Sequence, residues 1–293
     1  MRCSELMKRS VAYCPSGTSV LEAASIMSER DLGFLPVCND QCVAVGVITD
    51  RDIAVRVLAE RLSYENTRVA DVFTPTVVSC RSDDDLEVAE ERMSTFRKSR
   101  IVCTGDDGRL EGVISLSDLA KLESDGAGIV AAAIASRETS TAAHTPFVST
   151  GRLLECGDVM TSHVECCFRD DLVATVAEVM RDRDVGFVPI CDDTGRIVGT
   201  LTDRDLAVRV VAGGRSLATT RAVDVITPEL VYCAADDPLT VAEDLMSEYK
   251  KSRIVCAGED GRPSGIISLA DIARVEAPAI VSRILRDVAS ALV

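Results

Sequence analysis

The sequence has few of the side chains from which enzymes and aromatic cores are built. It contains no Trp and only 3% aromatic residues, so aliphatic residues and Cys must form the core. Its two histidines, His144 and His163, leave no His-containing zinc cluster visible. We find no Ser-His-Asp set, no P-loop and no dinucleotide-binding glycine motif. We therefore expect no catalytic residues, no catalytic cofactor, no metal site and a protein that is not an enzyme.

Long apolar segments and an excess of positive charge are also missing. The longest apolar stretch, Ile129–Ala135, is far too short to span a bilayer, and no secretory signal follows the charged N-terminal residues. The formal net charge of −15 disfavours binding to nucleic acid and to anionic membrane surfaces. We therefore expect a soluble, cytoplasmic protein whose partners are neither nucleic acids nor membranes.

The chain does contain an internal duplication. Thr49-Asp50-Arg51-Asp52 recurs 153 residues later as Thr202-Asp203-Arg204-Asp205, and the same offset carries Lys98–Cys103 onto Lys251–Cys256. By our count about half of the aligned positions in the two halves are identical, which indicates a duplicated pair of domains.

A weaker repeat lies inside each half, with an offset of 66 residues. It carries Gly46–Asp52 onto Gly112–Asp118 in the first half, and Gly199–Asp205 onto Gly265–Asp271 in the second. The chain is thus four units of about sixty residues each.

Every unit has the same predicted order of elements, β-α-β-β-α. In the first unit, turn residues and apolar spacing predict the following elements: a strand over Ser10–Tyr13, a helix over Ser19–Arg30 that Gly33 ends, strands over Phe34–Cys38 and Val43–Ile48, and a helix over Asp50–Glu60 that Thr49 caps.

These units resemble a known family. Each ends in strand-G-h-h-[ST]-x-x-D-helix, where h is apolar, and this pattern is similar to that of cystathionine-beta-synthase (CBS) repeats. The Thr-Asp-Arg-Asp version looks like that of stand-alone bacterial CBS-pair proteins. The resemblance implies an α/β fold in which four CBS repeats form two tandem Bateman modules, paired within one chain or through a homodimer.

We place the domain boundaries from the two repeats. The expected segments are a first module over 1–124 (repeats at about 1–61 and 68–124), a linker over 125–152, a second module over 153–277 (repeats at about 154–214 and 221–277) and a C-terminal amphipathic helix over 278–293. In the linker, Ile129–Glu138 is a predicted helix and Thr139–Thr150 a flexible segment. We interpret the C-terminal helix as docked on its own domain; a partner-binding or dimerisation helix is the alternative.

The [ST]-x-x-D spacing places a hydroxyl and a carboxylate on the first turn of a helix. A carboxylate can accept hydrogen bonds from both ribose hydroxyls, and a hydroxyl beside free N–H groups can hold a phosphate. The resemblance assigns ribose to Asp52, Asp118, Asp205 and Asp271, and phosphate to Thr49, Ser115, Thr202 and Ser268. The structural alternative is a capping box, which has the same pattern.

Phosphate also needs a cation. Arg100 and Arg253 are candidates in units two and four, whereas the aligned residues in units one and three are Phe34 and Phe187. Arg51 and Arg204 lie beside the ribose acid and are further candidates. Units two and four are therefore better equipped for phosphate, although a surface Arg is more often only solvated or salt-bridged.

The resemblance implies AMP, ADP, ATP or S-adenosylmethionine as a regulatory ligand, bound between paired repeats. We expect a regulatory protein that signals to a separate, unidentified effector protein. Twelve cysteines suggest an alternative, a thiol-based redox or metal sensor, and a ligand-free interaction scaffold is a third hypothesis. Because equivalent thiols such as Cys14 and Cys80 recur with the repeat, we interpret them as small buried side chains.

Overall fold

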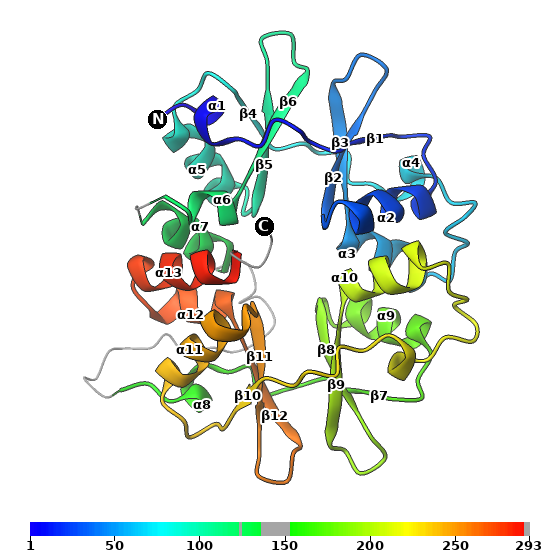
Figure 1. Cartoon of the computed structure of the whole chain (residues 1–293), viewed down its shortest axis with the longest axis vertical. Coiled ribbons are helices and arrows are strands. Elements are labelled where there is room, and N and C mark those ends of the chain that lie inside the picture. Colours follow the sequence, from blue (N-terminus) through cyan, green and yellow to red (C-terminus); the bar gives the residue numbers. More distant parts are fainter. Residues whose placement is uncertain (123–124, 136–152, 290–293) are drawn as a thin grey trace.

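The computed structural model of the chain describes residues 1–122, 125–135 and 153–289. Over these residues it has four three-stranded sheets, one for each unit, arranged around the centre of a disc (Figure 1). This confirms the α/β class and the four units. None of the described helices is both long enough and apolar enough to span a bilayer.

The first half of the chain supplies the upper two units in Figure 1. Unit one consists of α1 (Cys3–Leu6), β1 (Cys14–Pro15), α2 (Val20–Glu29), β2 (Phe34–Cys38), β3 (Ala44–Thr49), α3 (Asp50–Ile53) and its π-helical continuation η1 (Ala54–Leu58). Unit two consists of α4 (Val69–Val72), β4 (Ser79–Arg81), α5 (Leu86–Thr95), β5 (Arg100–Thr104), β6 (Leu110–Ser115) and α6 (Leu116–Leu119), and α7 (Gly126–Ala135) follows it.

The second half repeats this order below. Unit three consists of α8 (Cys156–Val159), β7 (Cys167–Phe168), α9 (Val173–Asp182), β8 (Phe187–Cys191), β9 (Ile197–Thr202), α10 (Asp203–Asp205) and the π-helical η3 (Leu206–Ala212). Unit four consists of η4 (Ala222–Asp224), β10 (Tyr232–Cys233), α11 (Leu239–Tyr249), β11 (Arg253–Ala257), β12 (Pro263–Ser268) and α12 (Leu269–Val275), and α13 (Pro278–Ala289) follows it.

The first unit shows where the predictions succeed and fail. The helix predicted over Ser19–Arg30 forms as α2, with Ser19 as its N-cap, and the strand Phe34–Cys38 is confirmed. The predicted strand over Ser10–Tyr13 is wrong, because parallel pairing with β2 begins only at Cys14. Gly33 does not end α2: the chain leaves the helix through Asp31, whose φ of 51° is left-handed.

Short N-terminal helices are exchanged between paired units. α1 of unit one packs on β6 of unit two, where the Sδ of Met7 lies 2.5 Å from an ideal Cβ built on Gly112. Equivalent close contacts join Phe73 to Gly46, Ile226 to Gly199 and Met160 to Gly265. The glycine of each G-h-h-[ST] motif is therefore required because the neighbouring unit places an apolar side chain on it.

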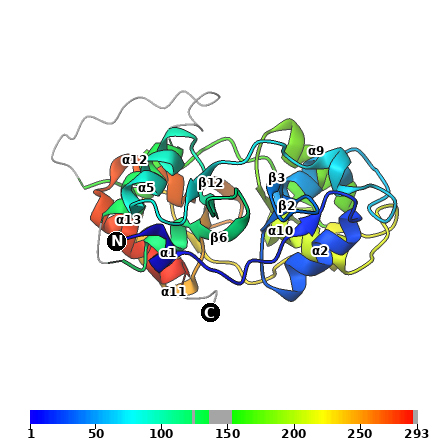
Figure 2. The ribbon, with the colours of Figure 1, turned by 90° about the horizontal axis from the view of Figure 1, so that it is seen from above.

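The hydrophobic core does not follow the division into modules. One cluster joins units one and three, and the other joins units two and four with α7 and α13. Seen from above, these are the two lobes of Figure 2. The modules therefore pair within this chain, and each lobe contains one unit from each module.

The helices that follow the two modules lie together in the lobe of units two and four. α7 overlaps the helix predicted over Ile129–Glu138 but already begins at Gly126, and residues 136–152 lie outside the described part. α13 buries Val281, Ile284 and Leu285 against its own chain, as the docked interpretation of that helix predicts. Gly128 N–H donates to Ser282 Oγ at 2.9 Å where α7 and α13 cross.

Candidate functional site

All four [ST]-x-x-D motifs form capping boxes at the start of a helix. In unit one, Thr49 Oγ1 accepts the Asp52 N–H at 3.2 Å and Asp52 Oδ2 accepts the Thr49 N–H at 2.9 Å. The same reciprocal bonds form at Ser115–Asp118, Thr202–Asp205 and Ser268–Asp271. The capping alternative is therefore confirmed as the local structure, and it leaves one oxygen of each acid for another partner.

In units one and three that second oxygen meets an arginine one turn further along the helix. Asp52 Oδ1 lies 3.1 Å from Arg56 Nη1 and accepts the Thr74 hydroxyl at 3.3 Å. Asp205 Oδ1 lies 3.2 Å from Arg209 Nη2. Arg56 and Arg209 were not predicted as site residues, although their i+4 spacing from the acids was visible in the sequence.

In units two and four the partners differ. Asp118 Oδ1 lies 3.6 Å from the Nζ atoms of both Lys8 and Lys121, and Asp271 Oδ1 lies 2.6 Å from Arg274 Nη1. Asp118 and Asp271 are buried. Lys8 comes from unit one, through the exchanged N-terminal segment, so only the fold could show that it reaches this acid.

The sheet register brings the predicted phosphate residues of units two and four together. Arg100 pairs with Ser115 across β5 and β6, and Arg253 pairs with Ser268 across β11 and β12. A guanidinium and a motif hydroxyl thus come from neighbouring residues on adjacent strands. The same register places Phe34 opposite Thr49 in unit one, so unit one itself supplies no cation at this cross-strand position.

Arg51 and Arg204 extend from one module to the other. Arg51 donates to the carbonyl oxygens of Val185 and, at 3.2 Å, Met180, and it pairs with Asp184 at 2.7 Å. Arg204 pairs with Asp31 at 2.5 Å. Both guanidinium groups therefore bind the residues that end the long helix of the opposing unit, and their role in phosphate binding stays a prediction.

Cysteine sulfurs form short chains inside units two and four. Cys80 Sγ lies 3.8 Å from Cys3 Sγ and 3.7 Å from Cys103 Sγ, and Cys233 Sγ lies 3.6 Å from Cys256 Sγ. All five are buried, as is Cys14, in agreement with the interpretation as small core side chains. In the described part of the chain, no group of three His, Cys, Asp or Glu residues is arranged to hold a metal ion.

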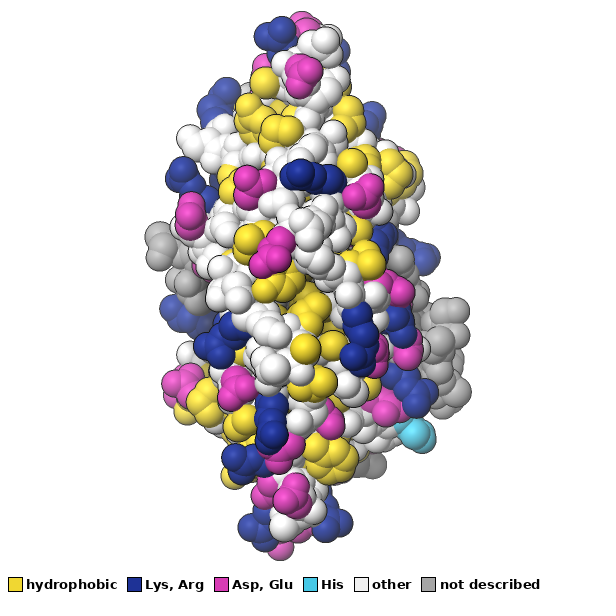
Figure 3. All heavy atoms as spheres, turned by 90° about the vertical axis from the view of Figure 1, so that its right-hand side faces the viewer, with side chains coloured by type: hydrophobic (Ala, Val, Ile, Leu, Met, Phe, Trp, Pro, Cys, Tyr) yellow, Lys and Arg dark blue, Asp and Glu magenta, His cyan; other side chains and the backbone are white. Residues whose placement is uncertain are grey.

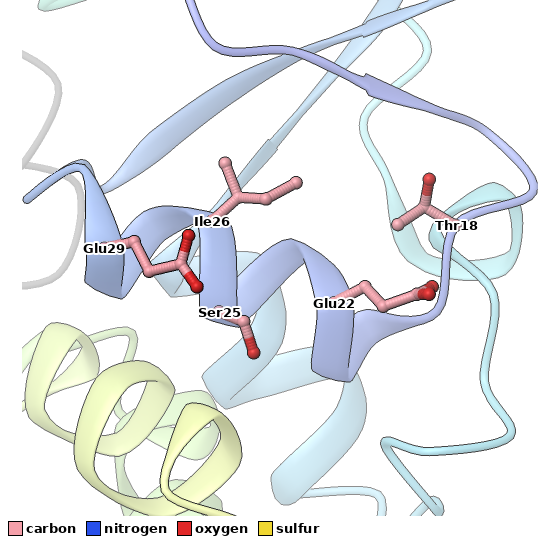
Figure 4. Close-up of a pocket in the computed structure, with 5 residues that line it drawn as sticks. All are labelled: Thr18, Glu22, Ser25, Ile26 and Glu29. Carbon is pink, nitrogen blue, oxygen red and sulfur yellow. The ribbon is translucent and has the colours of Figure 1, made fainter.

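A pocket of about 380 Å³ lies away from these motifs, on the surface of α2 (Figure 4). Its lining residues are Thr18, Glu22, Ser25, Ile26 and Glu29. All come from one helix and the turn before it, and none is a predicted site residue. In unit three the residue aligned with Ser25 is Glu178, which forms an ion pair with Arg61 of unit one. Ser25 cannot form such an ion pair, and the pocket lies at this position on α2.

The outer edge formed by units one and three is shown in Figure 3. Charged side chains of both signs are spread over this face, with apolar side chains between them along the long axis of the molecule. The described residues of this face therefore carry charges of both signs and form no patch of a single sign.

The sequence matches the CBS domain family model at residues 3–59, 69–125, 156–212 and 222–277. Hypoxic response protein 1 of Mycobacterium tuberculosis is 32% identical over 117 residues, which are 40% of this chain and 81% of that protein. The crystal structure of protein MJ1225 from Methanocaldococcus jannaschii has the same fold, with a TM-score of 0.62 and 18% identity over 93% of this chain and 99% of that one.

A CBS domain protein from Pyrobaculum aerophilum, PAE2072, is similar over a shorter length, and its crystal structure is a complex with AMP. The identity is 26%, the match covers 42% of this chain and 93% of that one, and the TM-score is 0.39. Because the family model matches most of the sequence and each match coincides with one structural unit, the chain belongs to the CBS domain family, with four repeats in two Bateman modules.

Proposed function

We propose that this chain is a regulatory protein that binds adenosine-containing nucleotides between paired repeats and signals to a separate effector. The observation that carries the proposal is the register that sets Arg100 beside Ser115 and Arg253 beside Ser268. Each of these serines lies one helical turn before a buried aspartate. The arginine and hydroxyl supply cation and donor for phosphate, and the acid supplies an acceptor for ribose hydroxyls.

Units two and four are the primary sites in this proposal. Asp118 and Asp271 hold the ribose, and Ser115 and Ser268 hold the phosphate. Asp52 with Thr49 and Asp205 with Thr202 form weaker sites, because the cross-strand neighbour of each hydroxyl is a phenylalanine. In all four sites the ribose must share an acid that is already paired with Arg or Lys, which lowers the net gain from binding.

Signalling requires a ligand with unequal affinity for two arrangements of the repeats. The acids of units one and two lie where these units meet, since Lys8 of unit one reaches Asp118 and Thr74, which follows α4 of unit two, donates to Asp52. A nucleotide in that place favours one relative orientation of the units and shifts the population toward it. The effector reads that orientation, and no bond of the nucleotide is broken.

The thiol-sensor alternative has weaker support. Burial raises the pKa of both Cys14 and Cys167 to about 12. The thiolate is the reactive form of cysteine, so these buried side chains are poor targets for oxidants.

Calorimetric titration with AMP, ADP, ATP and S-adenosylmethionine tests the proposal, and AMP is the first ligand to try. The Arg100→Ala/Arg253→Ala double variant should bind about tenfold to a hundredfold more weakly, since a hydrogen bond to a charged group contributes about 1.5–3 kcal/mol. Arg109→Ala/Arg262→Ala is the matched control, because both side chains are largely exposed in the hairpin turns. The proposal fails if none of the four ligands gives heat or raises Tm at millimolar concentration.

A further inference from the structure

Two acids of the repeated motif have no role in the proposed site. Asp50 and Asp203 each follow the capping hydroxyl of their unit. One carboxylate oxygen of each accepts the next backbone N–H, from Arg51 at 2.9 Å and from Arg204 at 3.0 Å. The other oxygen packs on a glycine: an ideal Cβ would lie 2.4 Å from Asp50 Oδ2 on Gly33 and 2.7 Å from Asp203 Oδ2 on Gly186.

Arginines from both modules converge on the same two glycines. The ideal Cβ of Gly33 is 3.1 Å from Arg204 Nη1, so Asp50 of one module and Arg204 of the other meet there. Gly186 has the mirror arrangement, with Asp203 and, at 3.5 Å, Arg51. α3 and α10, which carry these residues, contact each other across the module boundary.

The proposed phosphate arginines face the same cluster. Arg100 lies with its guanidinium 5.8 Å from the ring centre of Phe34, the residue after Gly33. The positive charge of Arg100 lowers the pKa of Asp50, and the positive charge of Arg253 lowers the pKa of Asp203. In the described chain neither Arg100 nor Arg253 has an acid within 4.0 Å, and Arg100 lies instead over the Phe34 ring.

The two acids are protonated more easily than an ordinary aspartate. Burial, followed by the charge of Asp203, raises the pKa of Asp50 to about 7, although Arg100 and Arg204 oppose the shift. Burial likewise raises the pKa of Asp203, with Asp205 adding to the shift and Arg253 and Arg51 opposing it. Two further acids lie at the edge of the cluster: Asp31 pairs with Arg204, and Asp184 pairs with Arg51.

We propose that nucleotide binding beside Arg100 or Arg253 is coupled to proton uptake by the Asp50–Asp203 pair. This inference rests on the proposed function and adds a regulator to it, the proton. A phosphate group brings negative charge beside the acids and draws the guanidinium away from them. A proton from solvent then bonds to a carboxylate oxygen and restores the charge balance in the cluster.

The sign of the coupling follows from linkage. The bound state holds more protons than the free state, so affinity increases as pH falls through the neutral range. Because Asp50, with a pKa of about 7, is already partly protonated in the free protein, binding should be at most about fivefold tighter at pH 7 than at pH 8. Because Asp50 and Asp203 belong to different modules, a nucleotide in either module titrates the same pair.

The test is calorimetry of AMP binding at pH 7.5 in buffers of different ionisation enthalpy, with the affinity also measured at pH 7 and 8. The wild type should take up a large fraction of one proton per AMP and bind up to about fivefold more weakly at pH 8 than at pH 7. Asp50→Asn/Asp203→Asn should bind AMP with little proton uptake and at least as tightly at pH 8. Asp40→Asn, at an exposed turn acid, should behave as the wild type.

The outcomes separate this inference from the proposed function. Binding without proton uptake in the wild type overturns the coupling and leaves the nucleotide site intact. Proton uptake that persists in Asp50→Asn/Asp203→Asn belongs to the phosphate of AMP and also overturns it. If none of the four ligands binds, both the proposed function and the coupling are overturned.

Discussion

The two lobes of the disc carry the same motif but join the modules differently. In the lobe of units one and three, α2 packs on η3 and α9 on η1, and Arg51 and Arg204 cross between the units. In the lobe of units two and four, α7 and α13 lie between the units and contact each other. A duplicated sequence therefore produced one lobe of direct contact and one with inserted helices, and only the second carries an arginine beside each motif hydroxyl.

The largest effect is expected where the inserted helices cross. A Cβ on Gly128 would lie 2.1 Å from the carbonyl oxygen of Pro278, and backbone cannot move aside as a flexible side chain can. Gly128→Ala should therefore destabilise the protein by about 3 kcal/mol, the upper part of the range for overpacking. Thermal unfolding should show a fall in Tm of about 10 °C.

The control for this variant is Gly17→Ala, because no atom lies within 4 Å of a Cβ at that position. Its Tm should change little. Within a helix such as α7, alanine is more favourable than glycine by about 1 kcal/mol, so Gly128→Ala would be stabilising if there were space for the Cβ. A rise in Tm of Gly128→Ala would thus show that the two helices do not approach so closely.

A buried acid in the same lobe makes stability depend on pH. Glu243 Oε1 has no partner in the described structure, and Arg283 lies 3.7 Å from Oε2. Burial, followed by the charge of Glu276, raises the pKa of Glu243 to about 7, with Arg283 opposing and Asp244 adding. The native state is favoured below the usual glutamate pKa, and this advantage is lost as pH rises through 7.

Glu243→Gln should accordingly be more stable than the wild type by about 2 kcal/mol at pH 8, and the difference should shrink toward zero near pH 4. Denaturant unfolding at both pH values measures it. The aligned acid Glu90 is only half-buried, so Glu90→Gln should show a smaller dependence. An equal gain in stability at pH 4 and pH 8 would show that the charge of Glu243 is not what destabilises the wild type.

The lobe of direct contact depends on the crossing arginines. Arg51→Ala should lose about 1–2 kcal/mol, because two main-chain carbonyl oxygens lose a charged donor, whereas its partner Asp184 is almost fully exposed and adds little. Arg204→Ala should lose less, since in the described part of the chain the Arg204 side chain pairs with the exposed carboxylate of Asp31 and with no main-chain carbonyl oxygen. Tm measured for both variants compares them, and a larger loss in Arg204→Ala would reverse this reading.

The smallest effect is expected at the end of η1. Arg61 has a left-handed φ of 53° and pairs with Glu178, whereas the aligned residue of unit three is Gly214. Arg61→Gly should change stability by less than about 1 kcal/mol, because relief of the left-handed strain offsets the exposed ion pair and the added chain entropy. Glu178→Ala removes the ion pair without changing the backbone at Arg61. A loss of stability above about 2 kcal/mol in either variant would show that the ion pair is not offset by relief of strain.

Much of the architecture was predictable from the sequence. The two offsets identified four units, an apolar run flanked by turn residues located the strand Phe34–Cys38, and apolar spacing located the helix that begins after Ser19. The four-residue helices such as α1 were missed, because one turn is too short to show a periodicity. Gly33 was assigned to the helix end when its lack of a side chain instead accommodates Asp50 and Arg204.

The candidate site was predicted in part. The motif hydroxyls, acids and arginines were identified by repetition, and the register then placed Arg100 beside Ser115 as neighbours. Neither Lys8 as a partner of Asp118 nor the cluster around Asp50 could be foreseen, because these residues meet across units that are far apart in the sequence.

By itself, the sequence determined the number of units, their order of elements and the capped helix starts, because these depend on local propensity and on repetition. The tertiary structure alone decided that the cores join units one with three and two with four, and that two inserted helices separate one pair. The physical reason is that an apolar face does not specify which of several similar faces will cover it. Shape, such as the space above Gly128, makes that choice.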